Sequence, residues 1–197
     1  MSVLQLEEPN LLQNLRLAEQ QQEWAMAQAI LQPLGEMYQR TGRKLEFQSL
    51  RLRLLKQVGV NLTSAKLKGK EAFGFWIYLR NQEANETAQS GNFDEAKKIY
   101  QEILNELTAL NDPSLSEQIA IFDNLLGNIA WELRQFDKAI TYYQKALHIF
   151  EAAGNDYSAA TVYLQLGNVA AGQQYFDQAI AYYPSFTRNG DRIFGTR

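Results

Sequence analysis

Residues 122–150 read FDNLLGNIAWELRQFDKAITYYQKALHIF and contain two amphipathic segments. Read at helical spacing, the first segment has an apolar stripe of Phe122, Leu125, Leu126, Ile129, Ala130 and Leu133. The second has a stripe of Phe136, Ala139, Ile140, Tyr143, Ala146, Leu147 and Phe150. Only Arg134 and Gln135 separate the two stripes. This stretch therefore predicts two helices joined by a tight turn.

A glycine, Gly127, lies inside the first stripe. Glycine in a helix interior costs about 1 kcal/mol of helix propensity relative to alanine. A missing side chain lets a second helix approach closely, and the small residues Ala139 and Ala146 in the second stripe fit such a crossing. We therefore expect the two helices of the hairpin to meet at Gly127, and at Gly167 in the following repeat.

The pattern recurs along the chain. LGNVA at 166–170 repeats LGNIA at 126–130, and FDQAI at 176–180 repeats FDKAI at 136–140, with an offset of 40 residues in both cases. Upstream, FDEA at 93–96 repeats the start of FDKAI with an offset of 43 residues. A period of this size predicts a solenoid of helical hairpins that bury their apolar faces against one another.

These repeats resemble the tetratricopeptide repeat (TPR) family. The resemblance rests on Leu126, Gly127, Phe136, Ala139, Tyr143 and Ala146, and on their counterparts Leu166, Gly167, Phe176, Ala179 and Tyr183. It implies an all-α, right-handed α-solenoid that acts as a non-catalytic protein–protein interaction module. The family repeat is usually 34 residues long, so the longer spacing here implies longer second helices or longer joints.

The pattern also predicts how the chain is divided. We expect a disordered start at 1–9, divergent helical repeats with a basic segment at 10–70, TPR-like repeats at about 71–110, 114–153 and 156–183, and an irregular tail at 184–197. Two registers fit the N-terminal repeats: Trp24 and Ala27 are spaced like Phe136 and Ala139, whereas Leu34, Gly35 and Tyr38 fit a first helix.

Residues 10–58 also resemble the helical array that follows the nucleotide-binding core of STAND-type signalling ATPases. That resemblance implies a sensor part of a larger signalling protein, with the ATPase outside this chain.

Composition argues against catalysis. The 197 residues include no cysteine and one histidine, His148, which excludes disulfides, thiolate metal sites and a zinc site of the usual His/Cys type. No phosphate-binding glycine motif occurs. We therefore expect no enzymatic activity, no cofactor and no metal.

The chain also lacks the sequence signals of membrane insertion or export. The longest apolar run, 72–79, is far shorter than the roughly 20 residues of a membrane span. The N-terminal sequence MSVLQLEEPN is acidic and has no apolar core, unlike a signal peptide. We expect a soluble, cytoplasmic protein with no membrane partner.

The predicted binding face is the side of each first helix that does not carry the apolar stripe. It comprises Ile121, Asn124, Asn128, Trp131 and Glu132 in the central repeat, Asn81 and Asn85 upstream, and Leu164 and Asn168 downstream. By resemblance, this face lines the concave groove in which TPR arrays hold a peptide.

An asparagine ladder runs along this face: Asn85, Asn128 and Asn168 are amides able to donate to and accept from a peptide backbone. The alternative is that these asparagines belong to the scaffold. The lysines of the family's carboxylate-clamp subset are absent at Asn81, Asn124 and Leu164, so capture of a C-terminal carboxylate in that way is not supported.

A basic segment at 40–70 holds nine basic residues against one acid, although the whole chain has a net charge of −3. Its candidate patch is Arg51, Arg53, Lys66, Lys68 and Lys70. Three interpretations stay open: a solvated helix face, docking against the acidic remainder within or between chains, and nucleic-acid binding. The partner classes predicted from the sequence are therefore a peptide or protein, less favourably nucleic acid, and a second copy of the chain in a self-assembly scaffold.

Overall fold

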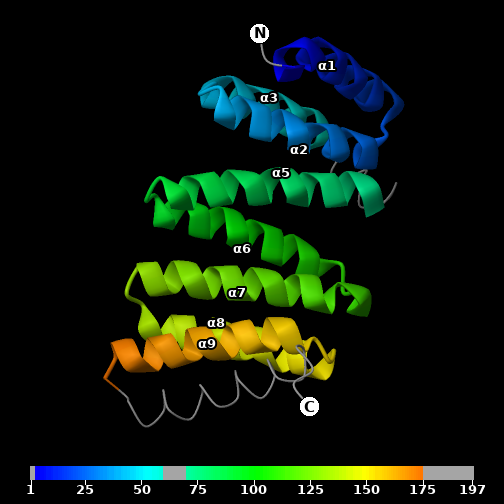
Figure 1. Ribbon diagram of the computed structural model, residues 1–197. Helices are drawn as coiled ribbons and strands as arrows, with labels where there is room; N and C mark the ends of the chain where they lie inside the picture. Colours follow the sequence, from blue (N-terminus) through cyan, green and yellow to red (C-terminus); the bar gives the residue numbers. More distant parts are fainter. Residues whose placement is uncertain (1–2, 60–69, 175–197) are drawn as a thin grey trace, which may run out of the picture. The chain divides into compact units, whose positions relative to one another are not determined.

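The computed structural model describes residues 3–59 and 70–174, and these residues form α-helices, turns and no strand (Figure 1). The helices are α1 (Val3–Gln21), α2 (Trp24–Arg40), α3 (Lys44–Gly59), α5 (Lys70–Gln89), α6 (Phe93–Ala109), α7 (Ser116–Glu132), α8 (Phe136–Ala152) and α9 (Asp156–Gly172). A 3-10 turn, η1 (Pro113–Leu115), precedes α7. The prediction of an all-α fold is confirmed.

The chain forms two compact units, residues 1–82 and 83–197, with the boundary inside α5. In unit 1, α2 packs against both α1 and α3. In unit 2, α7 packs against α6 and α8, and α8 packs against α9, so that the helical hairpins stack as an α-solenoid (Figure 1). The repeat segment 175–183, the tail 184–197 and residues 60–69, which include Lys66 and Lys68, lie outside the described residues.

One turn geometry recurs between the helices. A residue with positive φ ends the helix, and the next N–H donates to the carbonyl five residues earlier, as in the Schellman motif. The residues with positive φ in the five turns of this kind are Gln22, Gly42, Gly91, Arg134 and Gly154. Between α7 and α8, Gln135 N donates to Ala130 O at 2.8 Å. The tight turn predicted around Arg134 and Gln135 is therefore present, and it spans the three residues between Glu132 and Phe136.

The close crossing predicted at Gly127 is also present. A Cβ atom on Gly127 would lie 2.5 Å from Cε1 and 2.6 Å from Cδ1 of Tyr143, which is buried on α8. The ring of Tyr143, rather than the small residues Ala139 and Ala146, therefore fills the space over the glycine. The equivalent partner of Gly167 lies beyond residue 174, outside the described residues.

The N-terminus differs from the prediction. We expected disorder over 1–9, but α1 begins at Val3 and includes Pro9. Proline removes one backbone hydrogen bond from a helix, and tertiary contacts hold this turn: the Glu8 carboxylate accepts from Tyr38 Oη at 2.8 Å and from the Arg43 guanidinium at 2.7 Å. Contacts 30 and 35 residues away along the chain therefore stabilise a turn that local sequence marks as a break.

The first two helices form a hairpin of the same kind as α7 and α8. Their joint contains Gln22 with φ 58°, and Glu23 N donates to Ala18 O at 2.9 Å. Trp24 and Ala27 are buried at the start of α2. The joint between α2 and α3 has the same turn at Gly42, and a Cβ atom on Gly35 would lie 2.9 Å from Phe47 Cζ of α3. The structure is therefore compatible with both registers of the N-terminal repeats.

Candidate binding surface

The candidate binding surface lies on α7 and α9, and we define it by Glu117, Ile121, Asn124, Asn128, Trp131 and Glu132 of α7 with Tyr157, Leu164, Gln165 and Asn168 of α9. On α7, the neighbouring residues Phe122, Leu126 and Ile129 are buried in the core. Ile121 by contrast is 49% exposed, and Leu164 is 37% exposed. The helical period therefore separates a core face from an accessible face that carries both apolar and polar side chains.

The asparagines of this face are held by tyrosines of the following helix. Tyr143 Oη donates to Asn128 Oδ1 at 2.7 Å, and Tyr100 Oη donates to Asn85 Oδ1 at 2.7 Å. Each pair is separated by 15 residues. Burial raises the pKa of Tyr100 to about 12 and also raises the pKa of Tyr143. Both hydroxyls are therefore protonated donors at neutral pH, and each fixes the orientation of its asparagine.

Asn128 receives a second hydrogen bond across the repeat boundary. Gln165 Nε2 on α9 donates to Asn128 Oδ1 at 2.9 Å, so that one amide oxygen joins α7, α8 and α9. The sequence analysis did not select Gln165, because the equivalent residue one repeat earlier is Leu125 and the position carries no repeated polar signal.

The amide nitrogens on this surface remain available. Nδ2 of Asn85, Asn124 and Asn128 donates no hydrogen bond within the described residues, and none of these nitrogens is a buried unpaired atom. The Oδ1 of Asn124 and the Oε1 of Gln165, in contrast, are buried without a partner among the described residues. We expected amides that both donate and accept, but the oxygens face inward and the surface presents donors.

Trp131 has a packing role. Its ring lies 5.1 Å from the ring of Phe136, centroid to centroid, at an interplanar angle of 53°. A Cβ atom on Gly172 would lie 2.7 Å from Trp131 Cη2. The half-buried indole therefore packs against the start of α8 and the end of α9, and part of its surface stays exposed.

The other predicted residues are placed as follows. Asn81 lies one turn before Asn85 on α5, within unit 1, and its Oδ1 is buried without a partner among the described residues. Asn168 is exposed on α9, and Glu132 is exposed at the last residue of α7. The spacing between Asn168 and Tyr183 is also 15 residues, but Tyr183 lies outside the described residues.

Of the five residues in the candidate basic patch, the structure describes the side chains of Arg51 and Arg53. Arg51 is 4% exposed, so it contributes no charge to the surface. Arg53 binds the buried carboxylate of Glu19, with N···O distances of 2.7 and 3.1 Å. Arg43, in the same basic segment, pairs with Glu8 and Glu46. Unit 1 thus uses cations of this segment in internal ion pairs, while Lys66, Lys68 and the side chain of Lys70 are not described.

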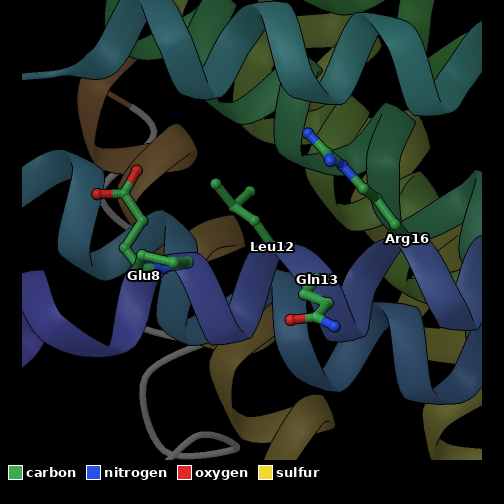
Figure 2. Close-up of a pocket in the computed structure, with 5 residues that line it drawn as sticks. Glu8, Leu12, Gln13 and Arg16 are labelled. Carbon is green, nitrogen blue, oxygen red and sulfur yellow. The ribbon is translucent and has the colours of Figure 1, made fainter.

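Unit 1 has a shallow depression of about 460 Å³ along α1, lined by Glu8, Pro9, Leu12, Gln13 and Arg16. Figure 2 shows Glu8, Leu12 and Arg16 projecting from the same side of the helix. Glu8 is already engaged there: its hydrogen bond from Arg43 lowers the pKa of its carboxyl group. Burial and the bond to Glu8 raise the pKa of Tyr38 to about 12. The Glu8 carboxylate therefore serves to hold α1 against α2.

Two further properties of residues 3–59 and 70–174 bear on function. No helix there is both long enough and apolar enough to cross a bilayer. These residues also contain no cluster of three or more His, Cys, Asp or Glu side chains placed to hold a metal ion.

Stacked helical hairpins with a glycine at the crossing and a repeated turn define a helical-repeat protein. Residues 117–183 match the sequence model described as Tetratricopeptide repeat. The fold is similar to that in the crystal structure of BtubC (BKLC) from P. vanneervenii, with a TM-score of 0.75 and 20% sequence identity, over 94% of this chain and 73% of that chain. No curated protein matches the sequence. The resemblance of residues 10–58 to the STAND array stays a prediction.

Proposed function

We propose that this chain is a non-catalytic module that binds an extended peptide segment of a partner protein on the candidate binding surface. The observation that carries the proposal is the Asn128 amide, whose oxygen is held by Tyr143 and Gln165 while its nitrogen stays available on the helix face that also carries Ile121. The match of residues 117–183 to the model of a family of interaction modules supports it.

The chemistry of the surface suits a peptide backbone. Every residue of an extended peptide has a backbone carbonyl that can accept a hydrogen bond. An extended segment makes no such bonds within itself, so its carbonyls need donors from the protein that binds it. The Nδ2 groups of Asn124 and Asn128 are donors of this kind, and the hydrogen bonds to the Asn128 oxygen fix the orientation of that amide. A backbone contact gives affinity without strong dependence on the peptide sequence.

Apolar contact supplies the remaining affinity. Ile121 and Leu164 are large apolar side chains left substantially exposed. Burying apolar surface contributes roughly 25 cal/mol per Å². Covering about 40 Å² on each side chain would therefore contribute about 1 kcal/mol apiece, or about a five-fold gain in affinity.

The test is selection of a random displayed peptide library on the purified chain, followed by titration of a recovered peptide. Ile121→Ala and Leu164→Ala should each weaken binding about five-fold. Because both side chains are exposed, stability should change by less than about 0.5 kcal/mol. His148→Ala, an exposed position on α8, is the matched control and should leave binding unchanged. Peptides that bind Ile121→Ala and Leu164→Ala as well as the unmodified chain would place the binding site elsewhere.

A further inference from the structure

The charges on α7 and α9 are of one sign. The charged residues of α7 and α9 are all carboxylates, namely Glu117, Asp123, Glu132 and Asp156. Neither helix contains Lys, Arg or His. The basic residues of the same segment lie on α8 and in the turn before it, at Arg134, Lys138, Lys145 and His148. The helices that form the candidate binding surface therefore carry carboxylates and no basic residue, whereas α6 and α8 carry charges of both signs.

Two of these carboxylates lie at the two ends of the surface. Glu117 precedes Ile121 by one helical turn, and Glu132 follows Trp131. Both residues are exposed, and neither forms an ion pair with a described residue. Glu117 does accept a hydrogen bond from Asn155 Nδ2 at 2.8 Å. Fifteen residues of helix separate the two carboxylates, which corresponds to about 22 Å at 1.5 Å per residue.

The position of Glu132 is unfavourable for the isolated helix. As the last residue of α7 it lies among the unpaired carbonyls, where the helix dipole disfavours a negative charge. Glu117, in the first turn, is at the favourable end. Residues that are unfavourable for the stability of their own helix, with no favourable contact to offset the cost, are expected at functional sites. An external cation would compensate Glu132.

We infer that the peptide bound on this surface is cationic, with an arginine or lysine side chain that reaches Glu117 or Glu132. The inference rests on the proposed function, because it assigns the charge of the same ligand. A guanidinium has five donors and matches a carboxylate with two parallel hydrogen bonds. An acidic peptide would face both carboxylates with no cation from α7 or α9 to offset the repulsion.

The experiment compares the peptides that the random library yields on the unmodified chain and on the double variant Glu117→Gln, Glu132→Gln. The unmodified chain should enrich peptides with net positive charge, and the double variant should lose that enrichment. A recovered cationic peptide should bind each single variant about two- to five-fold more weakly, the size of an exposed ion pair. Added salt should reduce this difference, because exposed charges are screened.

The matched control is the double variant Asp94→Asn, Asp137→Asn, which removes two exposed carboxylates from α6 and α8. It changes the net charge equally and should keep the cationic enrichment. Enrichment of neutral or acidic peptides whose binding still depends on Ile121 would overturn this inference and leave the proposed function standing. Equal loss in both double variants would also overturn it, because the effect would then be one of net charge. Peptides that bind independently of Ile121 and Leu164 would overturn the proposed function as well.

Discussion

Replacing Gly127 with alanine separates close packing from helix propensity. A Cβ atom at this position would lie 2.5, 2.6 and 3.0 Å from three ring atoms of Tyr143. Ordinary carbon contacts are about 3.5–4.0 Å, so the ring must move by about 1 Å. That movement is resisted, because Tyr143 is buried and its hydroxyl is hydrogen-bonded to Asn128 at 2.7 Å. Overpacking of this kind costs typically about 1–3 kcal/mol.

The control is Gly74→Ala in α5, where a Cβ atom would meet nothing within 4 Å. Both substitutions gain about 1 kcal/mol of helix propensity. The difference between the two variants therefore isolates the packing cost, and we expect Gly127→Ala to be about 1–3 kcal/mol less stable than Gly74→Ala. Urea unfolding, with the control run in parallel, measures this difference. Equal stabilisation of both variants would refute the close-contact role of Gly127.

Three further predictions concern the same unit. Arg134 has φ 55° and Gly154 has φ 69°, a left-handed conformation that costs a residue with a Cβ atom roughly 1–2 kcal/mol. Arg134→Gly should therefore raise the urea midpoint of unfolding, and Gly154→Ala should lower it. Opposite shifts would contradict the turn geometry. Burial raises the pKa of Asp123 to about 6, because the folded protein favours the protonated carboxyl group. The free energy of unfolding is therefore highest below about pH 4 and falls as the pH rises through 6 and the buried carboxyl group ionises. Asp123→Asn should therefore raise the free energy of unfolding by about 3 kcal/mol at pH 7.5 and change it little at pH 4, as measured by urea denaturation at both pH values; equal gains would exclude the carboxyl charge as the cause. Trp131→Ala should lower stability by about 2 kcal/mol, less than the 3–5 kcal/mol of a fully buried aromatic, and a thermal melt beside a peptide titration shows whether it also contributes to binding.

Sequence pattern was sufficient for the hairpins because their determinants are local and repeated. The apolar stripes on either side of Arg134 and Gln135 required a reversal, and the structure has one there. Glycines at 42, 91 and 154 coincide with left-handed residues that end helices. Gln22 and Arg134 adopt the same conformation without a glycine, so only the coordinates identify them.

Elsewhere, distant contacts outweighed local signals. Pro9 resembles a helix start, yet the bonds of Glu8 to Tyr38 and Arg43 hold the helix on both sides of the proline. The burial of Arg51 likewise depends on how α3 packs, since composition marks it only as one of many cations. The sequence shows the number of basic residues in a segment, whereas the packing of the helices determines which of their side chains are exposed to solvent.

The binding surface combines both kinds of information. The sequence repeat predicted Asn85 and Asn128 as surface residues. Tyr100 and Tyr143 each follow one of these asparagines by 15 residues, and this constant spacing is visible in the sequence. The direction of the hydrogen bonds requires the structure, because an amide can offer either end. Gln165 has no repeated signal, and its bond to Asn128 links neighbouring repeats that the sequence pattern treats separately.

Scaffold and ligand contact need not be alternatives for Asn128. Its oxygen accepts from Tyr143 and Gln165, a structural role, whereas its nitrogen remains accessible, as the proposed ligand role requires. Substitution by alanine would remove both ends of the amide, and the buried Tyr143 hydroxyl and the half-buried Gln165 amide would lose this acceptor, at about 1–3 kcal/mol for the buried donor. A loss of binding in that variant would therefore have two explanations. Exposed neighbours such as Ile121 and Glu132 have no comparable hydrogen bonds to the scaffold, so substitutions there address recognition with little disturbance of the fold.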